Sequence, residues 1–157
     1  MAKIIKLAAS VLACLLAGFV GSAATMSSIP TWYASLQKPA FNPPNWIFAP
    51  VWTTLFIMMG VAAFLVWDKG LENKKVRISL GIFGLQLLLN VLWSILFFGL
   101  QSPLYAFIDI IMLWASILAT IIYFYRISAA AAYLLIPYIL WVSFASLLNL
   151  SIAMLNR

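Results

Sequence analysis

The residues of this chain best suited to chemistry are aromatic, and they gather between Trp32 and Trp52. Prolines are interspersed among six aromatic side chains there: Trp32, Tyr33, Phe41, Trp46, Phe48 and Trp52, with Pro39, Pro43, Pro44 and Pro50. Prolines remove backbone donors and restrict φ, so we expect a stiff, non-helical strap up to about Pro44. Beside a bundle of apolar helices, such a strap suits a lid over an apolar binding site. The alternative is a proline-rich linker within the aromatic belt at the headgroup depth of a membrane.

Polar side chains within the apolar segments need a reason, because they are costly in lipid. Gln86, Asn90 and Ser94 recur every four residues and share one helix face, with Trp93 beside it. This stripe predicts either hydrogen bonds between helices or the polar wall of a cavity. For Asn149 and Asp109 we expect interhelical hydrogen bonds, and Asp109 has a backbone donor or a loop base as alternative partners.

Two further patterns concern helix faces. The last apolar segment carries a stripe of the i, i+3, i+4, i+7 type, formed by Trp141, Phe144, Ala145 and Leu148. A bulky indole one turn from a small alanine makes a notch, for which ordinary bundle packing is the alternative. Gly18, Gly21 and Ala24 form a ridge of small residues in the first segment, which favours close approach of another helix.

The residue types that are scarce exclude several classes of function. The chain has no histidine, one cysteine (Cys14) and three acidic residues (Asp68, Glu72 and Asp109). An intramolecular disulfide and the usual zinc, haem and iron–sulfur ligand sets are therefore ruled out, as are histidine-dependent triads. We expect no metal site and no conventional hydrolytic chemistry.

The elements that must position these residues are membrane helices. Of 157 residues, 66% are hydrophobic and 8% are charged, whereas a soluble domain averages about 25% charged. Five apolar segments are long enough to span a bilayer, and they predict an all-α bundle forming one membrane domain over 1–157. They run over about 4–26, 47–67, 78–100, 104–125 and 129–155, with a lid loop over about 27–46. We expect a kink at Pro137, and retention of the first segment as a helix instead of cleavage as a signal peptide, because it is longer than a usual signal core.

The charges predict an orientation. The N-terminus and the second and fourth loops carry seven basic residues: Lys3, Lys6, Lys69, Lys74, Lys75, Arg77 and Arg126. The opposite side carries only Lys38 and Arg157. The positive-inside rule then places the N-terminus in the cytoplasm and the lid loop and C-terminus outside. Because the basic residues lie in loops, the net charge of +6 does not indicate a nucleic-acid partner. The absence of an arginine- and serine-rich transit segment favours a prokaryotic plasma membrane.

In their order along the chain, these motifs resemble the translocator protein family (TspO/MBR, or tryptophan-rich sensory proteins). The resemblance covers nearly the whole sequence. The matching stretches are Trp32-Tyr33, Leu36-Gln37-Lys38-Pro39, Asn42-Pro43-Pro44-Asn45-Trp46, Ala49-Pro50-Val51-Trp52, Gln86 with Asn90 and Trp93, Phe97-Phe98, Ala106 with Asp109, and Pro137-Tyr138-Ile139-Leu140-Trp141 through Phe144-Ala145 to Leu148-Asn149.

The resemblance implies a five-helix bundle whose loop closes over a pocket that binds porphyrins and isoquinoline-type drugs. Carried over by position, the pocket residues are Tyr33, Pro43, Phe48, Trp52, Gln86, Asn90, Trp93, Tyr105, Ile110, Trp141, Ala145 and Leu148. A flat macrocycle can stack on indole and phenol rings, with its propionates near the aqueous edge and Lys38 as their candidate partner. Without histidine to ligate iron, a metal-free porphyrin is the better ligand, and no cofactor is required.

For such a protein the leading function is a membrane receptor or sensor of porphyrin-type ligands. The alternative is a light- and oxygen-dependent porphyrin-degrading enzyme using Trp141 and Trp52, and a passive porphyrin or lipid transporter ranks third. Membrane lipids and a second copy of the chain are the other expected partners. Three positions depart from the family pattern: Leu150, where the sterol motif of animal members needs tyrosine; Leu85 after Gly81, where some members repeat glycine; and Tyr105, where animal members have tryptophan.

Overall fold

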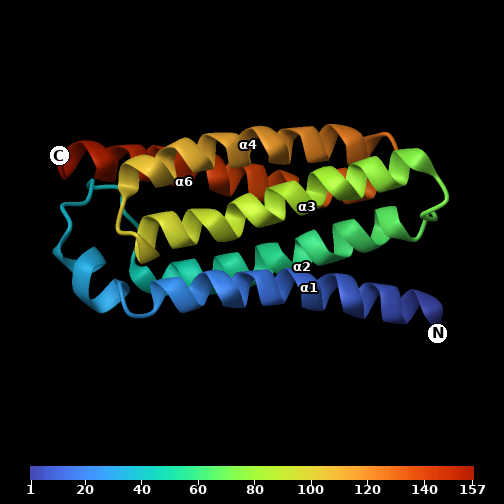
Figure 1. Cartoon of the computed structure of the whole chain (residues 1–157), viewed down its shortest axis with the longest axis horizontal. Coiled ribbons are helices and arrows are strands. Elements are labelled where there is room, and N and C mark those ends of the chain that lie inside the picture. Colours follow the sequence, from blue (N-terminus) through green and yellow to red (C-terminus); the bar gives the residue numbers. More distant parts are fainter.

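The computed structural model describes residues 1–157 and consists of helices joined by short connections. The α-helices are α1 (Ala2–Thr25), α2 (Phe48–Trp67), α3 (Lys74–Ser94), α4 (Pro103–Tyr125), α5 (Ala129–Leu134) and α6 (Ile136–Leu155). Five continuous or nearly continuous helical segments are long and apolar enough to cross a membrane. They lie side by side and run alternately up and down (Figure 1). The predicted all-α, five-span bundle is confirmed.

The helix ends follow local capping. Asn73 accepts a hydrogen bond from the backbone of Lys75 at 2.9 Å, so α3 begins at Lys74, four residues before the predicted start at residue 78. A π-helical segment, η3 (Ile95–Gly99), completes the third span. The other spans begin and end within two residues of their predicted bounds.

The fifth span is interrupted near its proline, as expected. α5 ends at Leu134 and α6 begins at Ile136, with Pro137 in the first turn of α6. Proline has no backbone N–H and its ring crowds the preceding turn, which kinks or breaks a helix. The break divides the span into a short helix packed on α2 and α4 and a longer one packed on α4.

The lid loop differs from the prediction in its first part. Residues Ile29–Tyr33 form a π-helical turn, η1, and the helical backbone continues through Ser35. The expectation of a non-helical strap from Trp32 is wrong there, because Pro30 lies in the first turn of η1, where its missing N–H costs nothing. The remaining prolines act as predicted: the chain is non-helical from Gln37 to Pro39 and re-enters helix only at η2 (Asn45–Ile47).

α1 and α2 approach very closely, and glycines make this possible. A Cβ at Gly60 would lie 2.5 Å from the Cα of Val11, and one at Gly18 would lie 2.7 Å from the ring of Phe56. A Cβ at Gly21 would meet the side chain of Ser94 on α3 at 3.1 Å. The predicted ridge of small residues therefore packs against two neighbouring helices.

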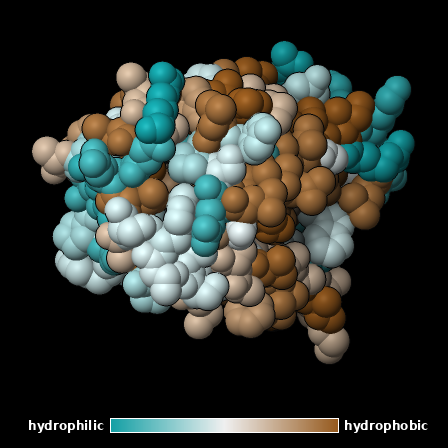
Figure 2. Space-filling view, turned by 60° about the vertical axis from the view of Figure 1, so that its left-hand side comes forward, coloured by the Kyte–Doolittle hydropathy of each residue, from teal (hydrophilic) through white to brown (hydrophobic).

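The connections between helices are divided between the two ends of the bundle. The lid loop, the α3–α4 connection and the C-terminus meet at one end, and the N-terminus and the other two connections lie at the opposite end (Figure 1). Hydrophobic side chains dominate the flanks between the ends, while hydrophilic ones gather toward the ends (Figure 2). Beneath the lid, a small apolar cluster links the loop to the bundle: Tyr33, Phe97, Ala106, Leu148 and Ile152.

Candidate ligand-binding pocket beneath the lid loop

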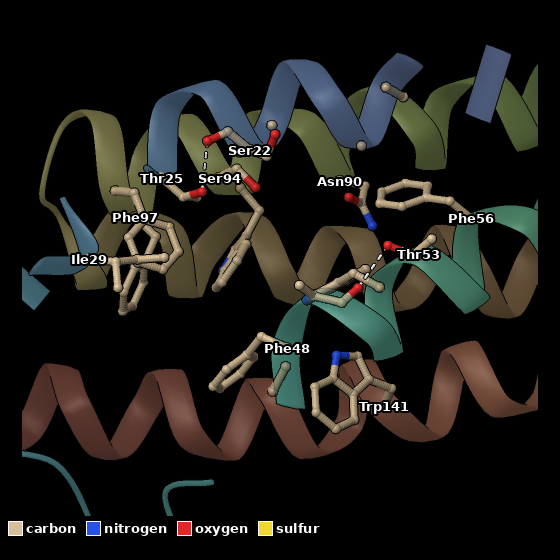
Figure 3. A pocket seen from close by; sticks show the side chains of 18 of the residues that line it. Ser22, Thr25, Ile29, Phe48, Thr53, Phe56, Asn90, Ser94, Phe97 and Trp141 are labelled. Atoms are coloured by element: carbon tan, nitrogen blue, oxygen red, sulfur yellow. Dashed lines mark hydrogen bonds between the residues drawn. The ribbon is translucent and has the colours of Figure 1, made fainter. Parts of the chain in front are cut away.

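A cavity of about 510 Å³ lies in the lid half of the bundle, enclosed by α1, α2, α3, η3, α6 and the lid loop. In Figure 3, Phe48 and Trp141 lie on the side of α2 and α6, and Ser22, Thr25 and Ser94 lie on the side of α1 and α3. No Asp, Glu, Lys or Arg lines the cavity, and most of its walls are apolar or aromatic. Its volume lies within the range of about 300–1,000 Å³ that is typical of small-molecule sites.

Eight of the twelve pocket residues expected from the sequence line this cavity. They come from four parts of the chain that are far apart in sequence, which the antiparallel packing of the helices brings together. The eight are Tyr33 from the lid, Phe48 and Trp52 from α2, Asn90 and Trp93 from α3, and Trp141, Ala145 and Leu148 from α6.

The other four do not line the cavity, for identifiable reasons. Tyr105 is 62% exposed on the outside of the bundle, and Ile110 is buried in the main core. No residue of α4 reaches the cavity, because α3, η3 and α6 contribute the wall on that side. Pro43 is half-buried in the lid away from the walls. Gln86 lies one turn below Asn90, where it bonds to Tyr138 instead.

The cavity also has a wall that the sequence reasoning missed. α1 contributes more residues than any other helix: Leu15, Ala17, Gly18, Phe19, Gly21, Ser22 and Thr25. The small-residue ridge was interpreted only as a packing surface. The same absence of bulk that lets helices approach also leaves room for a ligand, and the hydroxyls of Ser22 and Thr25 beside the ridge were the available signal.

Below the cavity, the polar stripe of α3 forms a hydrogen-bonded cluster with α6. The Asn90 amide donates to the hydroxyl of Tyr138 at 2.7 Å, and that hydroxyl donates to Gln86 Oε1 at 2.8 Å. The Gln86 amide points to the sulfur of Met59 at 3.8 Å. The stripe therefore serves both predicted roles: Gln86 joins helices, while Asn90 joins helices and also lines the cavity with Ser94.

We expect Tyr138→Phe to lower the free energy of unfolding by about 1–2 kcal/mol, the range of interhelical hydrogen bonds in membranes. The ring would stay packed, but Gln86 and Asn90 would lose a shared partner inside the bundle. Tyr133→Phe is the matched control, because Tyr133 is 62% exposed. Thermal unfolding in detergent measures both, and equal midpoints for the two variants would contradict the role of the cluster.

The two isolated polar residues behave differently from each other. Asn149 accepts from the indole of Trp93 at 2.9 Å and donates to the carbonyl of Pro103 at 2.8 Å, which confirms the expected interhelical bonding. Both carboxylate oxygens of Asp109 are buried without a hydrogen-bond partner. The expectation of a partner for Asp109 is therefore wrong. The residues on its own helix face, Ala106 and Leu113, are apolar and offer none.

Trp141 presents an unused donor. Its Nε1–H is buried and has no hydrogen-bond partner, although the side chain lines the cavity. The indole is held by an edge contact with the ring of Phe48 and a tilted contact with the ring of Phe144, whose centroids lie 6.0 and 5.5 Å away. A buried N–H without an acceptor costs free energy, so this position favours a ligand that carries an acceptor.

The lid loop closes the end of the cavity through its own contacts. The hydroxyl of Tyr33 donates to Asn42 at 3.1 Å, and the Lys38 ammonium lies 4.7 Å from the centre of the Tyr33 ring. Burial raises the pKa of the Tyr33 phenol above its ordinary value, which the hydrogen bond to Asn42 only partly offsets, so the phenol keeps its proton at physiological pH. Lys38 donates to the carbonyl of Leu36 at 3.2 Å and does not line the cavity.

Known proteins are similar in sequence to this chain over almost its full length. Residues 10–155 match the model of the TspO/MBR family. The chain is 49% identical over 154 residues to the tryptophan-rich protein TspO of Archaeoglobus fulgidus, covering 98% of this chain and 99% of that one. It is 47% identical to the tryptophan-rich protein TspO of Chlorobaculum tepidum, covering 98% of each chain. It is 39% identical over 132 residues to the human translocator protein, covering 83% and 78%. The chain belongs to the TspO/MBR family and is an integral membrane protein.

Proposed function

We propose that this protein is a membrane receptor or sensor that binds porphyrin-type tetrapyrroles in the cavity under the lid loop. The observation that carries the proposal is the aromatic, uncharged wall with a buried donor that has no partner, the Trp141 Nε1–H. A flat macrocycle stacks well on indole and phenol rings, and a pyrrole nitrogen or a propionate oxygen is an acceptor for that donor. Isoquinoline-type ligands share the flat apolar body and a carbonyl acceptor.

The cavity walls favour a metal-free macrocycle. The nitrogen and oxygen groups on them are amides, hydroxyls and indoles, with no imidazole or thiolate among them. Cys14 is buried in the main core and does not line the cavity. These groups offer hydrogen bonds to a ligand, and the one that can ligate haem iron, the Tyr33 phenol, already donates to Asn42 and keeps its proton.

We also infer an orientation in a prokaryotic plasma membrane. The seven basic residues of the N-terminus and of the second and fourth loops lie at the end of the bundle opposite the lid (Figure 1). The positive-inside rule supports a cytoplasmic position for that end and an outward-facing lid. Cysteine labelling with an impermeant reagent on whole cells tests this. Gln37→Cys should be labelled from outside and Asn73→Cys should be protected, and the reverse pattern would overturn the orientation.

The test of the receptor is titration of protoporphyrin IX into purified protein in the dark, followed by quenching of tryptophan fluorescence. Cavity indoles such as Trp52, Trp93 and Trp141 lie where a bound macrocycle would quench them. We expect saturable quenching with an unchanged porphyrin spectrum. Quenching that rises linearly, as it would for free tryptophan, would sink the proposal.

A second candidate function, light-driven porphyrin breakdown, is favoured by the position of two indoles on one cavity. Trp52 and Trp141 both line it, on different helices. A photoexcited porphyrin can take an electron from an adjacent indole, which leaves a porphyrin radical anion and an indole radical cation, and dioxygen is the oxidant that completes the reaction. This chemistry needs no general acid or base.

Trp141→Phe separates the two functions. If breakdown occurs, we expect the variant to lose product formation more than about tenfold under light at saturating porphyrin, while its dark Kd rises by no more than about tenfold, the loss of one hydrogen bond of about 0.5–1.5 kcal/mol. Trp46→Phe is the control, because Trp46 is 73% exposed and outside the cavity. Product spectra under illumination measure the effect, and unchanged product from Trp141→Phe would rule out its role as electron donor.

A further inference from the structure

The two helices that bound one side of the cavity are in closest contact toward its inner end, away from the lid. A Cβ at Gly60 would clash with the backbone of Val11, and one at Gly18 would clash with Phe56, so α1 and α2 are in closest contact there. Nearer the lid, Ser22 and Thr25 of α1 and Ala49 and Thr53 of α2 line the cavity. We call the part of the cavity wall that these four residues form the α1–α2 opening.

Residues beside the opening are accessible from outside the bundle as well as from the cavity. Ala49 and Thr53 are exposed although they line the cavity, and Phe19 is 69% exposed and also lines it. A residue that belongs to a cavity wall and to the outer surface marks a place where the two are continuous. Both helices are membrane spans, so this surface faces hydrocarbon.

The hydroxyl groups at the opening already donate hydrogen bonds to backbone carbonyls. Ser22 donates to the carbonyl of Phe19, Thr25 to that of Ser22, and Thr53 to that of Ala49, each at 2.8 Å. These bonds lie within each residue's own helix, so a ligand that passes does not break contacts between helices. The opening therefore presents a largely apolar path.

On the aqueous side, in contrast, hydrogen bonds hold the lid loop to the bundle. Asn156 at the end of α6 accepts from the backbone N–H of Gln37 and donates to the carbonyl of the same residue, both at 2.9 Å. Ser28 at the other end of the loop donates to the carbonyl of Phe98 at 2.7 Å. Opening the lid to water requires breaking these bonds, whereas passage between α1 and α2 requires none of them.

We infer that ligands exchange between the cavity and the bilayer through the α1–α2 opening, while the lid stays fastened to α6 by Asn156. The inference rests on the proposed ligand-binding function. The inference also narrows the ligand class to a flat amphiphile that dissolves in the outer leaflet of the bilayer and enters the site laterally. A water-soluble ligand of the same shape would be excluded.

Reversible crosslinking across the opening tests the route. Ser22→Cys and Thr53→Cys are combined on a Cys14→Ala background, with the protein in lipid vesicles, and joined by a flexible bifunctional thiol reagent that a reductant cleaves. We expect crosslinking after loading to slow the loss of protoporphyrin IX to excess acceptor vesicles by at least about tenfold. Crosslinking before loading should block quenching to the same degree, and reduction should restore exchange. Thr25→Cys with Ala49→Cys serves as a second pair if the first does not fold.

The matched control joins Gln37→Cys to Asn156→Cys, which ties the lid to α6 without touching the cavity. We expect this crosslink to leave exchange unchanged. The inference would be overturned if the lid crosslink trapped protoporphyrin IX in the cavity while protein crosslinked across the α1–α2 opening still exchanged it freely. That result differs from failure of the proposed function itself, in which the uncrosslinked protein would show no saturable quenching at all.

Discussion

Replacing Ala145 by phenylalanine should raise the Kd for protoporphyrin IX by at least about a hundredfold, or about 2.8 kcal/mol. Ala145 is 9% exposed and lines the cavity one turn from Trp141, where its small side chain leaves the notch predicted from the sequence. A benzyl group at this position would occupy the space that a macrocycle needs beside the indole. Dark titration by tryptophan quenching measures the change.

Ala115→Phe is the control for added bulk. Ala115 is exposed on α4, a helix that contributes nothing to the cavity. We expect its Kd to match that of the native protein, and both variants to unfold at similar temperatures. Undiminished affinity in Ala145→Phe would mean that porphyrin binds elsewhere on the molecule.

Gly60→Leu should prevent the bundle from forming or lower its free energy of unfolding by at least about 3 kcal/mol, the upper part of the range for overpacked cores. Even the first added atom would lie 2.5 Å from the Cα of Val11, 2.9 Å from its nitrogen and 3.0 Å from the carbonyl oxygen of Ser10. All three are backbone atoms, so no side chain can rotate away and α1 must move as a unit. Unfolding in mixed detergent micelles, followed by circular dichroism, measures the loss.

Gly81→Leu isolates the effect of the clash from that of losing a glycine. A Cβ at Gly81 would meet nothing within 4 Å, so the new side chain points into lipid and the variant should be at least as stable as the native protein. The comparison belongs on monomeric protein, so that packing of a second copy on the exposed face at Gly81 does not change the result. Similar losses in both variants would show that the close approach of α1 and α2 contributes little.

Helix positions were predictable because the membrane leaves so little choice. In hydrocarbon every backbone N–H and C=O must bond within the protein, so a long apolar segment is a helix whatever its neighbours are. Pro137 could be placed as an interruption for the same local reason. The early lid loop was mispredicted because proline composition alone does not say whether Pro30 begins a helical turn or ends one.

The walls of the cavity were partly predictable, and the differences between the expected and the observed walls have one physical cause. Periodicity states which residues of a helix share a face, but not which neighbour that face meets. Asn90 and Gln86 share a face of α3, yet only Asn90 reaches the cavity, because Tyr138 of α6 packs against the stripe and bonds to Gln86. Tyr105 lies on α4 facing outward, where no pattern in its own helix distinguishes it from a wall residue.

The sequence by itself determined the class of protein: five membrane spans, a proline- and aromatic-rich loop, and the family. These properties follow from composition and from residues close together in the chain. Only the tertiary structure decided that α1 supplies a wall and α4 does not, and that Asn156 holds the backbone of Gln37. Each of these depends on how helices are rotated and offset against one another. Packing between residues distant in sequence sets those angles, so no single segment encodes them.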